Sequence, residues 1–517
     1  MSQALQPAVV LVADRTLSAR YRVLFEGIFA TAQTTQVPEV MMRRLLAPPA
    51  ATEAAGRART VPLGLRRVES ALAARTPLGP DDVVCTTPEA LPRLLGPWTK
   101  VVAVSSSDPL GHGMSNTTTR EFSRGALYTR VWADRLMGEI ADARRRFHFR
   151  VIAGGGGAWQ YVHYADDAAR HAVDTVFEGY FEADGPDLVR SIAEGGDAPA
   201  HHRSRDGAAD RAVPILGPST MGMIELSRGC GNGCRFCLMA DRRMEHLAED
   251  TILADVETNV AAGAGALASS SEDFFRYGAA GRRVNFDRLR GLLARMQAVR
   301  RGTFVQVSHA NITSVLQLDA DQLAEIRRLL AAEPDARYLW VNLGLESANG
   351  RLVHANGPGK IAPFDPDDWE AMALDAANRL RRAGFFPVFS LVLGLPGETV
   401  DDVRRTRRLA DRLAQGPAAV FPVFHEPVRP DRDGRPFRLP AMTREHLDLY
   451  AASYEVNFRW IPSLYWDNQK AGGVGLLRRT LAQALGRAEI RLWRRRFRRL
   501  AAALDAAESA VPAAQNT

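Results

Sequence analysis

The strongest chemical signal in the sequence is a cluster of three cysteines in the segment Arg228-Gly-Cys230-Gly-Asn-Gly-Cys234-Arg-Phe-Cys237. A structural zinc site needs four ligands, and the one other cysteine, Cys85, lies far away in the chain. His246 is the nearby residue that would complete a zinc site, so zinc stays open as an alternative. Three thiolates on a glycine-rich loop fit a [4Fe–4S] cluster in which one iron has no protein ligand. At such an iron a small molecule can chelate the metal and receive an electron.

The cysteine segment directly follows the first strand of a βα series, which we expect to fold as a partial (β/α) barrel over residues 216–425. Functional residues of such barrels lie at the C-terminal ends of the strands. The expected strands are residues 223–227, 264–269, 304–308, 339–345 and 388–393, and the expected helices include 250–262, 286–300, 319–332 and 367–383.

Polar or glycine-rich segments end four of these strands. They are Ser269-Ser-Ser271-Glu272-Asp273, Gln306-Val-Ser308-His309-Ala-Asn311, Gly344-Leu-Glu346-Ser347-Ala-Asn349 and Val392-Leu-Gly394-Leu-Pro396-Gly397-Glu398-Thr399. A serine or glutamate at the end of a strand is ordinarily a cap or turn residue. The order of all four segments after a cysteine loop is the more specific observation.

The cysteine spacing, the aromatic residue before Cys237 and these strand-end segments together resemble the radical SAM superfamily, over about residues 220–425. The resemblance implies that Cys230, Cys234 and Cys237 ligate a [4Fe–4S] cluster and that S-adenosylmethionine (SAM) binds its open iron. One-electron reduction would then yield a 5′-deoxyadenosyl radical. The other SAM-site residues that the resemblance implies are Phe236 near the adenine, Glu272 and Ser271 at the ammonium group, Ser308 and His309 near the ribose and carboxylate, and Glu346, Ser347 and Gly394 in the last two segments.

Residues 1–195 show a second βα alternation, with expected strands at 9–13, 83–85, 101–105 and 149–153 and helices at 65–74, 88–95 and 130–146. This pattern predicts an α/β, doubly wound, Rossmann-like domain whose ligand lies beyond the carboxyl ends of the strands. Residues 196–215 are small, charged and aperiodic, which predicts a linker in which His201 and His202 are solvated.

A doubly wound domain before a radical SAM core resembles the cobalamin-binding members of the superfamily. The segments that correspond are 106–119, 154–159 and 176–182. The cofactor-binding residues implied there are Ser106, Asp108, Gly111, Ser115, Thr117, Gly155, Gly156, Glu178 and Gly179. The Asp-x-His-x-x-Gly signature of cobalamin mutases is absent, because His112 has no aspartate two residues before it. The alternative is a domain that kept this fold and lost the ligand.

The combined resemblance implies an enzyme that methylates an unactivated carbon of a small-molecule or natural-product substrate, through methylcobalamin and the 5′-deoxyadenosyl radical. The alternative is a radical SAM enzyme of the same architecture that catalyses cyclisation, oxidation or rearrangement without methylation. A flavodoxin- or ferredoxin-type electron donor is implied as a partner. A labelled S-methyl group in the product separates the two readings.

Residues 426–517 are expected to be a mostly helical region that caps the substrate site. Within it, residues 487–504 form an amphipathic helix with many arginines. Docking on the barrel is the ordinary explanation, and a peripheral membrane contact or RNA binding are the alternatives. The composition (46% hydrophobic, 24% charged, net charge +7) and the absence of a signal-like N-terminus or a long apolar run lead us to expect a cytoplasmic protein, with no nucleic-acid partner required.

Overall fold

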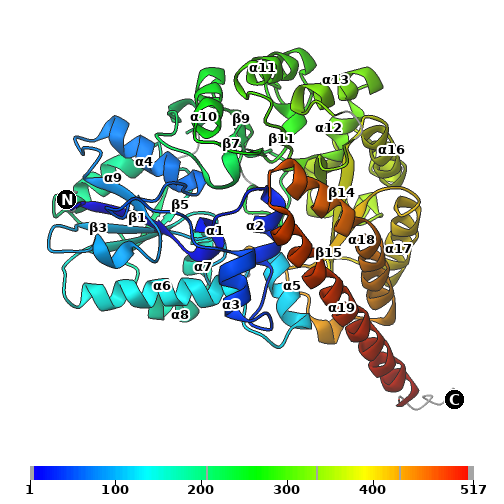
Figure 1. The fold of residues 1–517 in the computed structure, drawn as a ribbon. Helices are drawn as coiled ribbons and strands as arrows, with labels where there is room; N and C mark the ends of the chain where they lie inside the picture. The colour runs from blue at the N-terminus through cyan, green and yellow to red at the C-terminus, as the bar shows by residue number, and fades with distance from the viewer. Residues whose placement is uncertain (1–4, 205–207, 241, 334–335, 430–431, 511–517) are drawn as a thin grey trace.

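The computed structural model describes residues 5–204, 208–240, 242–333, 336–429 and 432–510 (Figure 1). It contains an N-terminal α/β layer and a second, strongly curved parallel sheet that lie side by side, with the longest helices at the C-terminal end of the chain (Figure 1). The α/β fold expected from the sequence is confirmed.

The N-terminal sheet has six parallel strands in the order β2-β1-β3-β4-β5-β6. They are β1 (Val9–Ala13), β2 (Val83–Thr86), β3 (Val101–Ser105), β4 (Arg150–Gly154), β5 (Thr175–Glu178) and β6 (His201–Arg203). Helices α4 (Leu63–Arg75) and α9 (Gly185–Ala193) cover one face, and α6 (Tyr128–Arg144) covers the other. The strand order reverses between β1 and β3, so a ligand crevice is expected beyond the carboxyl ends of these two strands.

The predicted linker contains the edge strand β6, so the segment is not aperiodic throughout; of its two histidines, His201 is exposed and His202 is partly buried. Residue 201 pairs in parallel with Val176 of β5, His201 Nε2 lies 2.8 Å from Glu178 Oε2, and the ring of His202 stacks on Phe177 with centroids 5.2 Å apart. An edge strand needs backbone partners on one side only, so a polar sequence can occupy it without an apolar signature.

The second sheet is built from parallel strands that break between β11 and β12, which gives two adjoining parts in the orders β11-β10-β7 and β12-β13-β14-β15. The strands are β7 (Met223–Glu225), β10 (Leu267–Ser270), β11 (Val305–Gln306), β12 (His309–Ala310), β13 (Trp340–Glu346), β14 (Phe386–Leu393) and β15 (Ala419–Phe424). The helices along the outside include α10 (Glu249–Ala261), α11 (Phe286–Val299), α13 (Ala320–Leu330), α16 (Trp369–Arg382) and α17 (Val400–Leu413). Strand β15 was not expected, because Pro422 interrupts its pattern; proline is tolerated on an edge strand.

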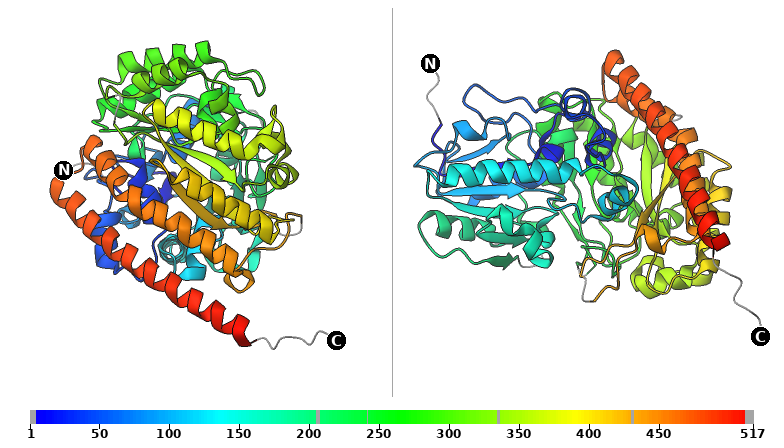
Figure 2. Two further views of the ribbon diagram at one scale, coloured as in Figure 1. Left: turned by 90° about the vertical axis from the view of Figure 1, so that its right-hand side faces the viewer. Right: turned by 90° about the horizontal axis from the view of Figure 1, so that it is seen from below.

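The C-terminal region forms α18 (Arg444–Ala471) and α19 (Leu476–Ala510), and the end of α19 projects beyond the body of the molecule (Figure 2). Trp493 and Phe497 on α19 are buried in the core of the second sheet, and Arg494 forms an ion pair of 2.7 Å with Glu455 of α18. The apolar side of this helix therefore packs against the rest of the protein, as the explanation of docking on the barrel expects. Within the described residues, no helix combines the length and the apolar character that a membrane span requires.

Helix α5 (Met114–Phe122) joins the two halves of the molecule. It follows β3 of the N-terminal sheet, yet its Phe122 lies in the core of the second sheet, with ring centroids 4.6 Å from Tyr450 and 5.6 Å from Phe424. Thr118 Oγ1 accepts a hydrogen bond of 2.7 Å from the Phe424 backbone N–H. A side chain from a helix of the N-terminal domain thus accepts the hydrogen bond of a backbone N–H on the edge strand β15. That N–H is therefore not left unpaired.

Replacing Phe122 by alanine tests this contact. We expect Phe122→Ala to lower the free energy of unfolding by about 3 kcal/mol, because it leaves a cavity in an aromatic core. The matched control is Leu477→Ala on α19, whose residue is 75% exposed; it should change the free energy by less than about 0.5 kcal/mol. Urea denaturation followed by tryptophan fluorescence measures both, and equal midpoints would show that α5 does not stabilise the interface.

Candidate functional site

The cysteine loop, defined here as residues 229–240, is closed at its base by a short antiparallel pair. Strand β8 (Ser227–Arg228) pairs with β9 (Glu245–His246), which brings the two ends of the loop together. Gly229, Gly231 and Gly233 adopt φ values of +69°, +68° and +67°. These alternating left-handed positions coil the backbone, and only glycine adopts them without a steric penalty.

The three thiols lie near one another inside this coil. Cys234 is 7% exposed, and Cys230 and Cys237 are half-buried. Burial, together with the neighbouring Cys230 and Cys234, raises the pKa of Cys237 to about 12. Among the described residues, no three His, Cys, Asp or Glu side chains gather closely enough to hold one metal ion.

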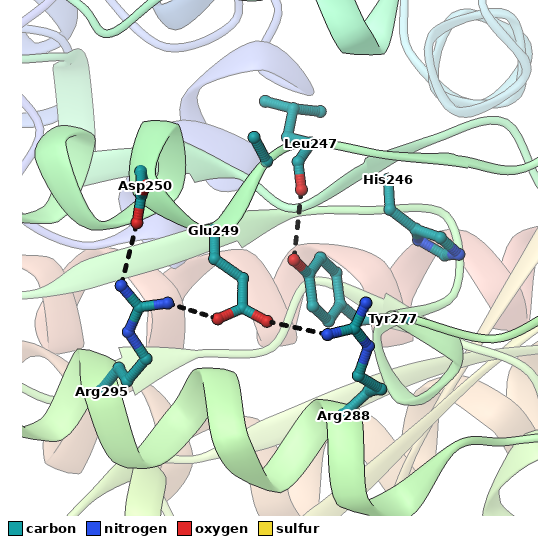
Figure 3. A pocket seen from close by; sticks show the side chains of 9 residues that line it. His246, Leu247, Glu249, Asp250, Tyr277, Arg288 and Arg295 are labelled. Carbon is teal, nitrogen blue, oxygen red and sulfur yellow. Dashed lines mark hydrogen bonds and ion pairs between the residues drawn. The ribbon is translucent and has the colours of Figure 1, made fainter.

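His246, the residue considered as a fourth zinc ligand, points elsewhere. Its Nε2 lies 3.1 Å from the carbonyl oxygen of Ala279, and it lines a cavity of about 480 Å³ beside α10 and α11 (Figure 3). In that cavity Glu249 pairs with Arg295 at 2.6 Å, and Tyr277 donates to the Leu247 carbonyl oxygen at 3.1 Å. None of the site residues predicted from the sequence lines it.

A segment that the sequence analysis missed forms the floor of the cysteine loop. It follows α14 (Gly350–Asn356) and runs into α15 (Pro358–Ile361). The Asn356 carbonyl oxygen accepts from the Arg235 N–H at 2.8 Å, and the Gly359 N–H donates to the Asn232 carbonyl oxygen at 2.9 Å. A Cβ on Gly357 would lie 2.8 Å from Cys234 Sγ, so a glycine is required there. The run Asn-Gly-Pro-Gly-Lys is the one sequence signal that this segment carries.

Ser271, Glu272, Ser308 and His309 come together at the strand ends beside this loop. Ser271 Oγ lies 2.5 Å from Ser227 Oγ, and Ser308 Oγ donates to the Ser271 carbonyl oxygen at 3.4 Å. Burial raises the pKa of Glu272 to about 7, and its buried Oε2 has no hydrogen-bond partner. His309 is accessible although burial lowers its pKa, which is the behaviour of a side chain that faces an internal space.

Glu346, Ser347 and Gly394 have separate partners. Glu346, at φ +61°, forms an ion pair of 2.8 Å with Lys360 of α15. Ser347 Oγ lies 3.3 Å from Thr406 Oγ1 of α17. The Gly394 N–H donates to Glu398 Oε2 at 2.6 Å, and Glu398 in turn contacts His446 of α18. Ser347 and Gly394 thus connect the sheet to its covering helices.

Phe236 lies in an apolar cluster that crosses from one half of the molecule to the other. The cluster contains Phe236, Cys234 and Leu352, and Cys237 packs against it. Met114, at the start of α5 in the N-terminal domain, also packs against this cluster. The segment expected to bind cobalamin and the cysteine loop therefore share this apolar cluster.

The loops of the N-terminal crevice are organised by Asp108. Its carboxylate accepts from the Gly113 N–H at 3.0 Å, from Asn116 Nδ2 at 2.5 Å and from Gln160 Nε2 at 2.5 Å. Asp108 is therefore fully engaged in holding the loop after β3. The adjoining turn has left-handed backbone at Gly111 (φ +77°), and Ser115 and Thr117 lie on α5, where Thr117 Oγ1 donates to the Met114 carbonyl oxygen at 3.1 Å.

Other residues of the N-terminal crevice have polar atoms without hydrogen-bond partners, or border space that no side chain fills. Ser106 Oγ and His112 Nδ1 are buried without a hydrogen-bond partner. A Cβ on Gly156 would meet no atom within 4 Å, whereas one on Gly155 would collide with Ser105. These orphaned polar atoms and the bare backbone at Gly156 fit a bulky polar ligand at the switch point.

Glu178 and Gly179 stand at the end of β5, where the N-terminal domain meets the exit of the cysteine loop. Glu178 pairs with His201, and a Cβ on Gly179 (φ +104°) would lie 2.9 Å from Arg242 Nη2. Just beyond them, the ring of Tyr180 lies 4.2 Å from the Arg228 guanidinium.

Buried, oppositely charged side chains pair across the contact between the N-terminal domain and the cysteine loop. We call this set of residues the interface network. Arg228 pairs with Glu182 at 2.6 Å and with Glu225 at 2.8 Å. Arg67 of α4 pairs with Glu225 at 3.1 Å and with Asp255 of α10 at 2.5 Å. Glu182 and Arg67 belong to the N-terminal domain, and the other three belong to the second sheet and its helices. Arg228 lies two residues before Cys230.

Comparison with known proteins gives a family match in the middle of the chain. Residues 224–410 match the radical SAM superfamily. The ribosomal protein uS12 methylthiotransferase RimO of Anaeromyxobacter sp. (strain Fw109-5) is 26% identical over 224 residues, which are 42% of this chain and 43% of that protein. The chain thus spans less than half the length of this relative.

Two solved structures of the radical SAM methyltransferase TsrM from Kitasatospora setae share the fold, each with a TM-score of 0.51. The one with cobalamin and a [4Fe–4S] cluster bound is 14% identical and covers 82% of this chain and 78% of its own. The one with tryptophan and the SAM analogue aza-SAM bound is 15% identical and covers 82% and 75%.

The raised pKa of Glu272 predicts a pH-dependent stability. Between pH 4.5 and about 7 the folded protein keeps a proton that the unfolded chain has released. Stability from the neutral carboxyl group is therefore complete at low pH and is lost as the pH rises through about 7. In the ligand-free protein, Glu272→Gln should become progressively more stable than the wild type as the pH is raised from about 5 to about 8.

Thermal denaturation across this pH range measures the difference. Exposed Glu194→Gln is the control for the loss of one carboxylate. A stability difference between Glu272→Gln and the wild type that stays constant with pH would contradict the expectation.

Proposed function

Because residues 224–410 are a radical SAM domain, we propose that the chain is a cobalamin-dependent radical SAM enzyme that methylates an unactivated carbon of a small-molecule substrate. The observation that supports the proposal is an apolar cluster shared by the two candidate sites. Met114, at the start of the helix after β3, packs against the cluster that contains Cys234 and Phe236. A group bound at the crevice and a group bound at the thiols would thus lie on opposite sides of one shared interface.

When bound, a [4Fe–4S] cluster with SAM supplies carbon-radical chemistry, and cobalamin supplies methyl-carrier chemistry. Cys230, Cys234 and Cys237 would hold the cluster. The Glu272 carboxylate, whose Oε2 has no other partner, would accept hydrogen bonds from the SAM ammonium group. Ser271, Ser308 and His309 would surround the rest of that ligand, with Phe236 beside its adenine.

In the N-terminal domain, Ser106 and the backbone at Gly155 and Gly156 would contact the corrin or its side chains. Asp108 would act indirectly, by holding the loop that carries Gly111. The two halves would exclude water from between these groups, since the interface network and α5 close the space around them. An electron donor of the flavodoxin or ferredoxin type completes the proposal.

Metal content after anaerobic expression with cobalamin tests the proposal. We expect about four irons and one cobalt per chain, as one [4Fe–4S] cluster and one corrin require. Cys234→Ala should lose the iron and keep the cobalt. Gly156→Leu should keep the iron and lose the cobalt, because the new side chain enters the space left open at the switch point.

The matched control is Gly138→Leu on α6, where a Cβ also meets no atom within 4 Å; it should keep both metals. Iron without cobalt in the wild type would remove cobalamin from the proposal, and zinc without iron would overturn it entirely. With both metals present, transfer of labelled methyl groups from SAM to product separates methylation from non-methylating cyclisation, oxidation or rearrangement.

A further inference from the structure

Lys360 is a buried lysine beside the cysteine loop. Only 8% of the residue is exposed, and its Nζ lies 2.8 Å from Glu346 Oε1. Asn311 Nδ2 donates to the Lys360 carbonyl oxygen at 2.9 Å, which anchors α15 to the strand-end segment after β12. A lysine is rarely buried to this extent without a partner that requires its charge.

Lys360 belongs to the segment that packs directly under the cysteine loop. Its neighbour Gly357 contacts Cys234, and Gly359 is hydrogen-bonded to the backbone of the cysteine loop at Asn232. Burial opposes the charge of Lys360, but Glu346, Cys234 and Cys230 together raise its pKa above the ordinary value.

Two arginines also lie beside the cysteine loop. Arg276 Nη1 donates to the Cys230 carbonyl oxygen at 3.0 Å and lies 3.9 Å from Asp273 Oδ2. The second is Arg282, which has a different function. Its guanidinium donates to Asn232 Oδ1 at 2.8 Å and to the Gly231 carbonyl oxygen at 2.9 Å. These bonds hold the shape of the loop at its partly exposed rim. Lys360 instead lies within the protein, where solvent screens a charge least.

We propose that Lys360 is the buried counter-charge of the cysteine site and that the Lys360–Glu346 pair sets the reduction potential of the cluster bound there. The inference rests on the proposed function in one respect, that the cysteines hold a [4Fe–4S] cluster. Reduction transfers one electron from an external reductant to the cluster and makes or breaks no bond. The electron adds a negative charge, which a nearby cation stabilises and a nearby carboxylate destabilises.

The two members of the pair should therefore shift the potential in opposite directions. Lys360→Met removes the cation and should lower the ratio of reduced to oxidised cluster at a fixed potential about tenfold, a shift of about 59 mV to more negative values. Glu346→Gln removes the anion and should raise that ratio. A purely structural ion pair predicts no such opposition, because breaking it from either side would disturb the loop in the same sense.

The measurement is a redox titration of the iron-loaded full chain, without SAM, followed by electron paramagnetic resonance of the reduced cluster. Lys360→Arg keeps the cation and should keep the potential near that of the wild type. Arg235→Gln is the matched control, since Arg235 lies on the same loop next to Cys234 but is exposed. Screening by water should leave its effect small.

Unchanged potentials in Lys360→Met and Glu346→Gln, at full iron content, would overturn the inference and leave the proposed function intact. Shifts of the same sign in both variants would also overturn it. If Lys360→Met does not fold, the rise expected for Glu346→Gln and the constancy expected for Lys360→Arg still decide the matter. A wild-type chain that binds no iron would instead refute the proposed function, and the inference with it.

Discussion

The structure depends on the pairing of buried charges between its two halves. Arg228, Arg67, Glu182, Glu225 and Asp255 are all almost completely buried. Removing such groups from water costs several kcal/mol each unless they are paired with good geometry. Two arginines and three carboxylates are paired with one another in the observed placement of the two halves. Because Arg228 begins the segment that contains Cys230, that placement also determines where the cysteine loop lies.

Helix α5 extends the same interface through apolar contacts. Phe122 enters the aromatic core formed with Tyr450 and Phe424, and Thr118 satisfies a backbone donor of the edge strand β15. One turn earlier, Met114 reaches the cluster around Cys234. The helix that follows the β1/β3 switch point thus packs against the cluster around the cysteine loop and against the C-terminal helices.

Positive and negative side chains lie together beside the cysteine loop. Glu272, Asp273 and Glu346 bring carboxyl groups to the strand ends, and burial raises the pKa of Asp273 to about 6 and that of Glu272 to about 7. Lys360 supplies positive charge at Glu346, and Arg276 supplies it near Asp273. In the proposed function, Glu272 would bind the cationic group of the ligand, apart from the Lys360–Glu346 pair.

Local sequence patterns determined the elements and the identity of the reactive groups. The apolar runs of β1, β3, β4 and β14, the helices between the strands and the cysteine spacing are properties of short segments, which the chain displays without folding. Strand β6 was hidden by its polar edge position and β15 by Pro422. Lys360, the Asp108 network and the entry of Phe122 into the other domain have no local signature. They arise from contacts between residues far apart in the chain. Such contacts form only when the tertiary structure removes these groups from water and places each beside one specific partner.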